Sequence, residues 1–120
     1  MTNIKTGVLI TPDNTISNIE LDMTEHTNNI SELLNDKLTF VGQILREPSK
    51  CNAVIINGKN SKLKNLDKNK YYIPPFDEDV YGSIFIICMD ENSEPQNFIK
   101  DDLEEYIENY ETLYKKNYYD

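Results

Sequence analysis

The stretch Val80-Tyr-Gly-Ser-Ile-Phe-Ile-Ile-Cys-Met89 is the most apolar run of the sequence and decides the fold. It is rich in β-branched and aromatic residues and too short for an independent helix, which predicts a strand buried on both faces. Pro74-Pro75 precedes the run and Asp90-Glu91-Asn92 follows it, so residues that break regular structure stand on both sides. We therefore expect the other elements to cover this strand.

Four further runs predict strands, at residues 4–10, 15–21, 37–45 and 51–56. The first two flank Thr11-Pro-Asp-Asn14, a turn sequence, and predict a hairpin. Gly42 inside the third run indicates a bulge or a close approach of another chain segment. Asn57-Gly58 predicts a turn after the fourth run, and the Lys- and Asn-rich residues 59–70 predict a loop with Leu63 turned inward.

Two helices complete the prediction. Residues 28–36 carry Ile30, Leu33 and Leu34 on one apolar face. Residues 98–116 carry a longer apolar stripe, formed by Ile99, Leu103, Tyr106, Tyr110 and Leu113. Asp101 and Glu104 resemble a capping box at its start. Together these elements predict a single α+β domain, residues 1–120, with a mostly antiparallel sheet of about five to six strands and both helices packed on it.

Composition excludes several classes of protein. The chain has 120 residues, 38% of them hydrophobic, and no apolar run approaches the ~20 residues of a membrane span. The N-terminus lacks the apolar core and cleavage site of a signal peptide, so we expect a cytoplasmic protein. Cys51 and Cys88 fall in apolar runs and are expected to be reduced thiols. The sole histidine, His26, has no cysteine near it in sequence, so no metal and no cofactor are expected.

The sequence also offers no catalytic constellation. Asp77, Glu78 and Asp79 are consecutive, which is typical of a solvated turn rather than of a calcium loop. A lone histidine gives no nucleophile–base pair, and the segments around Gly58 and Gly82 lack the glycine density of a phosphate loop. We therefore expect a protein that is not an enzyme.

Charge divides the chain into three parts. There are six acids and two bases in residues 1–45, two acids and seven bases in 46–75, and 13 acids and three bases in 76–120. The middle part predicts an anion-contact loop formed by Lys59, Lys62, Lys64, Lys68 and Lys70. The acidic last helix and the aromatic segment Tyr71–Tyr81 predict a surface for a protein partner. Its candidate members are Tyr71, Tyr72, Phe76, Tyr81, Glu104, Glu108, Glu111, Tyr114 and Tyr118.

Three alternatives to a plain protein-binding role stay open. The acids after residue 76 are compatible with a mimic of DNA that occupies a DNA-binding enzyme. The basic loop is compatible with contact to nucleic acid through phosphates, with Tyr71 and Tyr72 beside it to stack on bases. The basic loop of one copy and the acidic helix of another would form a homo-oligomer.

The order of these pieces resembles a small uncharacterised domain family of phages and large DNA viruses. The resemblance rests on the opening hairpin, on Ile30-Ser-Glu-Leu-Leu34, and on the Lys/Asn-rich turn followed by Ile73-Pro74. It continues in Val80-Tyr-Gly-Ser-Ile-Phe-Ile86 and in the acidic last helix. The resemblance implies no reaction and no catalytic residues. It implies a viral accessory protein that acts inside the infected cell.

Overall fold

The centre of the fold is strand β7 (Ile84–Met89). The computed structural model describes residues 3–44, 51–71, 73 and 78–119. Every residue of β7 except Met89 is buried, and its side chains alternate between two apolar clusters. Ile84, Ile86 and Cys88 belong to one cluster, and Phe85 and Ile87 belong to the other. The prediction of a strand buried on both faces is confirmed for this part of the apolar run.

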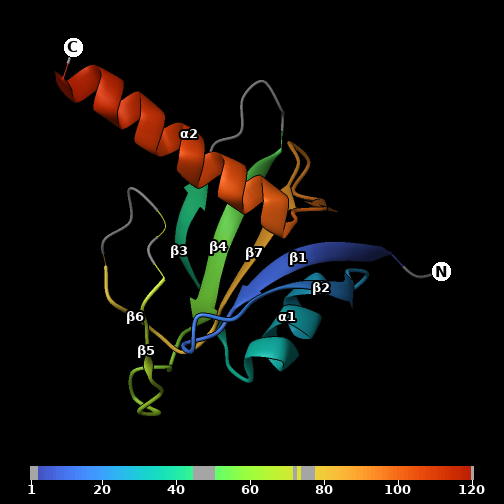
Figure 1. Ribbon diagram of the computed structural model, residues 1–120. Coiled ribbons are helices and arrows are strands. Elements are labelled where there is room, and N and C mark those ends of the chain that lie inside the picture. The colour runs from blue at the N-terminus through green and yellow to red at the C-terminus, as the bar shows by residue number, and fades with distance from the viewer. Residues whose placement is uncertain (1–2, 45–50, 72, 74–77, 120) are drawn as a thin grey trace.

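The main sheet has six strands, and all of its neighbouring strands are antiparallel (Figure 1). Its members are β1 (Ile4–Ile10), β2 (Ile16–Asp22), β3 (Leu38–Ile44), β4 (Asn52–Gly58), β7 and β8 (Pro95–Gln96). The order is β2-β1-β7-β4-β3, and β8 pairs with the far end of β7. Two hairpins, β1–β2 and β3–β4, thus lie on either side of β7. This arrangement confirms the predicted antiparallel sheet of an α+β fold.

The apolar run does not form one continuous strand, contrary to the prediction. Val80–Tyr81 forms a separate short strand, β6, which pairs with β5 (Lys68–Asn69). Gly82 separates β6 from β7 with a φ of 76°, a left-handed conformation that glycine adopts without a steric cost. Its N–H donates to the carbonyl of Asp67 at 2.8 Å. The chain therefore bends at Gly82 because β6 leaves the main sheet to pair with the loop after β4.

Helix α1 (His26–Leu34) covers part of one face of the sheet. Its Ile30 is buried in the cluster that contains Phe85 and Ile87. The helix ends at Asn35, whose left-handed backbone lets the N–H groups of Asn35 and Asp36 donate to the carbonyls of Glu32 and Ser31. The prediction of 28–36 placed this helix two residues too far along the chain at each end.

Helix α2 (Lys100–Tyr119) crosses the opposite face, as Figure 1 shows. The first backbone N–H of the helix, that of Lys100, donates to the side-chain oxygen of Asn18 on β2 at 2.8 Å. The capping carboxylate is Asp102, which accepts from the N–H of Ile99 at 3.1 Å, rather than the predicted pair Asp101 and Glu104. Leu103 is fully buried, whereas Ile99 stands before the helix and is partly exposed. Compared with the predicted range 98–116, the helix begins two residues later and ends three residues later.

Several local features can also be compared with the sequence-based predictions. The register of β3 shifts between Phe40 and Gly42, which confirms the predicted bulge. Cys51 and Cys88 are thiols and form no disulfide. Strand β4 continues through the expected turn dipeptide to Gly58, since Asn57 pairs with Ile84 of β7. The short strand β8 follows shortly after the breakers Asp90-Glu91-Asn92, and no strand was predicted there. The inward placement expected for Leu63 is wrong, because this side chain is 83% exposed.

Candidate functional site

An acidic face runs along the outward side of α2. Its members are exposed carboxylates three or four residues apart on the helix, or adjacent to one another: Asp101, Glu104, Glu105 and Glu108. Residues at spacings of three and four lie on the same side of a helix. The inward side packs on the sheet through Leu103, Tyr106 and Ile107. This part of α2 therefore presents one sign of charge to solvent.

Tyr71 lies next to this acidic face. Its ring packs against the same apolar cluster as Tyr106 and Ile107. Burial, and then the negative charge of Glu104, raise the pKa of the Tyr71 phenol above its usual value. The structure thus brings together two members of the predicted partner surface, Tyr71 and Glu104, from segments that are far apart in the sequence.

The other members of the predicted partner surface are distributed differently. Tyr81 lies on β6 at the opposite end of the sheet from α2 (Figure 1), and the ammonium of Lys62 stands 5.9 Å from its ring centroid. Tyr72 and Phe76 lie outside the described residues. Glu111, Tyr114 and Tyr118 belong to α2, but their side chains lie outside the described part of the structure.

The predicted anion-contact loop makes several contacts within its own chain. The Lys68 ammonium lies 2.8 Å from the Asp79 carboxylate, and this contact raises the pKa of Lys68 and lowers that of Asp79. Lys64 donates to the carbonyl of Asn35 at 2.6 Å and stands 3.8 Å from the Asp36 carboxylate. Lys59 and Lys70 are exposed. Part of the positive charge of this loop is therefore neutralised locally.

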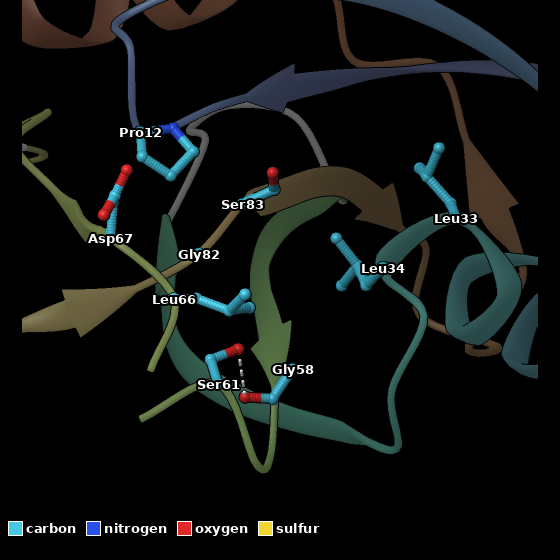
Figure 2. A pocket seen from close by; sticks show the side chains of 9 residues that line it. All are labelled: Pro12, Leu33, Leu34, Gly58, Ser61, Leu66, Asp67, Gly82 and Ser83. Atoms are coloured by element: carbon cyan, nitrogen blue, oxygen red, sulfur yellow. Dashed lines mark hydrogen bonds between the residues drawn. The ribbon is translucent and has the colours of Figure 1, made fainter. Parts of the chain in front are cut away.

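A pocket of about 260 Å³ lies beside this loop. Figure 2 shows the side chains that line it, and the elements that contribute them meet at the end of the sheet away from α2 in Figure 1. The pocket is formed where four segments meet: the β1–β2 turn, the end of α1, the chain after β4 and the bend before β7. Its lining residues are Pro12, Leu33, Leu34, Gly58, Ser61, Leu66, Asp67, Gly82 and Ser83. Leucine side chains line opposite sides of the pocket in Figure 2, and Ser61 donates to the carbonyl of Gly58 at 2.9 Å.

Two buried asparagines hold the wall of the pocket at Gly82. The Asn57 amide donates to the carbonyls of Tyr81 and Ser83 at 2.9 and 3.0 Å. The Asn69 amide donates to the carbonyls of Gly82 and Ile10, both at 3.0 Å. These bonds fix three successive carbonyls of the bend and tie it to the end of β1. The backbone of this wall is therefore positioned by side chains of the fold itself.

A carboxylate fixes the loop on the other side of the pocket. Asp36 accepts from the backbone N–H of Asn60 at 2.8 Å, from its side-chain amide at 3.0 Å, and from the N–H of Lys37 at 2.7 Å. Burial raises the pKa of this carboxyl, but the hydrogen bonds from Asn60 and Lys37 outweigh it, so the net pKa lies below the usual value. Asp36 is therefore ionised when it holds the loop at Asn60.

The pocket combines aliphatic and polar groups. Its aliphatic wall consists of Leu33, Leu34 and Leu66, and its polar groups are two serine hydroxyls and the exposed Asp67 carboxylate. Among the residues that the structure describes, no three His, Cys, Asp or Glu side chains group as metal ligands. The site is suited to hold one aliphatic side chain or a small ligand of mixed polarity.

Sequence reasoning missed this pocket and the two asparagines that support it. The available signal was the position of Asn57, directly after the apolar residues 53–56. A buried amide in a strand must find hydrogen-bond partners, and an adjacent chain bend is a common source of free carbonyls. The partners themselves come from residues 24 and 26 positions away, so sequence alone does not identify them.

The fold and these surfaces define an α+β protein with a charged helical face and a small pocket. The chain belongs to a family of unknown function (DUF5880), whose model matches residues 8–106. Comparisons with curated proteins and with solved structures gave no match. Within the described residues, neither helix has the length and apolar composition that crossing a bilayer requires.

Proposed function

We propose that this protein is a non-enzymatic accessory protein that binds another protein through the acidic face of α2 and the adjoining Tyr71. The observation that carries the proposal is the placement of Tyr71 against the α2 side of the core, within the electrostatic reach of Glu104. A half-buried tyrosine supplies a large contact area with little loss of side-chain freedom on binding. The setting inside an infected cell, implied by the sequence resemblance, belongs to this proposal.

The charge of the face indicates the kind of partner. Asp101, Glu104 and Glu105 are exposed on one helix, in a chain with a net charge of −9. A field of one sign attracts a surface of the opposite sign and accelerates the encounter, and salt weakens that attraction. We therefore infer a partner with a basic surface, which contacts the carboxylates while an apolar group covers the Tyr71 ring.

The test compares two charge reversals of equal size. E104K/E105K changes the acidic face, whereas E25K/E32K changes exposed carboxylates at α1, on the opposite face of the sheet. Glu25 makes no side-chain capping hydrogen bond, so its replacement removes no cap at the start of α1. Wild type and both variants serve as bait in lysate of the native host, and captured proteins are quantified by mass spectrometry.

A partner that supports the proposal is captured by wild type and by E25K/E32K and is lost from E104K/E105K. Its affinity for the purified wild type should fall with rising salt, and E104K/E105K should weaken it by about tenfold or more. Equal capture by both variants, or an affinity independent of salt, would exclude the acidic face as the binding surface.

A mimic of DNA is the second candidate, because the exposed acids recur along one helix face. In that case the captured partner is a DNA-binding enzyme, and duplex DNA displaces it from the acidic face in competition. Direct contact with nucleic acid through the Lys59–Lys70 loop has weaker support, because Lys64 and Lys68 already contact Asp36 and Asp79. A mobility-shift assay at low salt tests it.

A further inference from the structure

Leu63 is an exposed aliphatic side chain on a hydrogen-bonded turn. It is 83% exposed, more than any other large hydrophobic side chain among the described residues. The turn is one helical turn, in which the N–H of Lys64 donates to the carbonyl of Asn60 at 2.9 Å. Asn65, with a φ of 58°, ends it, and the N–H of Leu66 donates back to the carbonyl of Ser61.

This turn borders the pocket directly. Ser61 and Leu66, the residues two before and three after Leu63, both line the pocket. Asp36 fixes the start of the turn at Asn60, so the position of Leu63 relative to the pocket is set by hydrogen bonds. A protruding leucine and an aliphatic pocket therefore occupy one patch of the surface, and little conformational entropy is lost when either is used in binding.

The pocket has room for a side chain of this size. Its volume is about 260 Å³, whereas an apolar cavity of roughly 150 Å³ already accommodates benzene. Leu33, Leu34 and Leu66 offer aliphatic contacts on opposing sides (Figure 2). The adjoining loop also carries less net positive charge than its lysines suggest, because Lys64 and Lys68 lie beside Asp36 and Asp79. The electrostatic repulsion between the loops of two copies of the chain is reduced accordingly.

We propose that two copies of this chain associate about a two-fold axis, each inserting Leu63 into the pocket of the other. A two-fold interface uses the same patch on both subunits, so it requires a protrusion and a matching recess within one patch. Leu63 and the pocket meet that requirement. The proposed dimer uses the end of the sheet away from α2, so it goes beyond the partner binding proposed above and does not depend on it.

The experiment measures mass against protein concentration by sedimentation equilibrium for the full chain. Leu63→Asp removes the protrusion, and Ser83→Phe fills the pocket while leaving the backbone carbonyl that Asn57 holds. Phe40→Asp is the matched control, since Phe40 is 70% exposed on edge strand β3. Circular dichroism verifies that each variant is folded.

Wild type and Phe40→Asp should dimerise with similar dissociation constants, and each of the other variants should raise that constant by about tenfold or more. An equimolar mixture of Leu63→Asp and Ser83→Phe keeps one intact leucine–pocket contact per heterodimer. That mixture should therefore associate more strongly than either variant alone. A wild type that stays monomeric, or a dimer weakened by Phe40→Asp and not by Leu63→Asp, overturns the proposal.

Discussion

The sharpest prediction concerns Asn69, whose side chain connects three segments of the chain. Its amide nitrogen donates to the carbonyls of Ile10 and Gly82, both at 3.0 Å, and its oxygen accepts from the N–H of Tyr71 at 3.1 Å. The side chain is buried. Asn69 therefore holds the end of β1, the bend before β7 and the backbone of Tyr71, whose ring packs on the same apolar cluster as α2.

Asn69→Ala should destabilise the fold by about 3 kcal/mol, because three hydrogen bonds are lost at roughly 1 kcal/mol each. A domain of this size has an unfolding free energy of roughly 5–15 kcal/mol, so the variant should still fold. Urea unfolding followed by circular dichroism measures the change. The dependence of the unfolding free energy on urea should match wild type, since the same surface is exposed on unfolding.

Asn69→Asp should be more harmful than Asn69→Ala at pH 7, because a carboxylate oxygen would face the two carbonyls that now accept hydrogen bonds. That repulsion raises the pKa of the introduced carboxyl in the folded state above its unfolded value. The damage is therefore present above the folded pKa and decreases as the pH falls through it. Unfolding curves at several pH values between neutrality and the acid range should show this recovery.

The same substitution at Asn18 provides the control. The Asn18 side chain acts as an acceptor for the N–H of Lys100 at the start of α2. Asn18→Asp keeps that acceptor and adds negative charge at a helix N-terminus, so it should leave stability unchanged or raise it by up to about 1 kcal/mol. If Asn69→Asp and Asn18→Asp have equal effects, or if Asn69→Asp shows no pH dependence, the donor role assigned to Asn69 is wrong.

Three further predictions concern single positions. Gly82→Ala should cost about 1–3 kcal/mol in urea unfolding, because φ is 76° and a Cβ would lie 2.9 Å from the Leu66 side chain. Gly7→Ala should cost a similar amount, about 1–3 kcal/mol, because its Cβ would meet the Phe85 ring and lie 2.8 Å from the Ile86 carbonyl. Adding Phe85→Leu should relieve the ring contact only, so a double-mutant cycle should show partial recovery and full additivity would contradict the packing. Asp36, whose pKa lies below the usual 3.8, contributes stability that is lost as the pH falls below that value, so Asp36→Asn should flatten the acid limb of the stability–pH curve.

The parts of the fold that sequence predicted are those set by local pattern. The apolar residues of β7 indicate burial on both faces whatever their neighbours are, and the stripe that includes Leu103 and Tyr106 indicates a helix with one buried side. The break at Gly82 was not predictable in the same way. Glycine is compatible with a strand, and it becomes a bend here because Val80–Tyr81 pairs with Lys68–Asn69, a partner specified only by the tertiary fold.

For the candidate surfaces too, features set by local sequence pattern were predictable and features set by tertiary contacts were not. The position of acids on the outer side of α2 follows from helical spacing. The structure shows Asp101, Glu104, Glu105 and Glu108 exposed, whereas Asp102 is half-buried and accepts from the N–H of Ile99. The exposure of Leu63 contradicts the rule that places an apolar residue of a polar loop inward. The reason is Ser61, which is buried in place of Leu63 and donates to the Gly58 carbonyl, so the turn directs Leu63 to solvent.

The two proposed surfaces lie at opposite ends of the sheet, and this separation makes them independently testable. The acidic face belongs to α2, whereas the pocket lies among the β1–β2 turn, the end of α1 and the bend at Gly82 (Figure 2). No residue is shared between them, so coupling between distant, independent sites should be small. Leu63→Asp should therefore weaken self-association and leave capture of a basic partner unchanged, and E104K/E105K should do the reverse. If Leu63→Asp stays folded by circular dichroism and yet loses both self-association and partner capture, the partner recognises only the dimer, and the acidic faces of two copies act together.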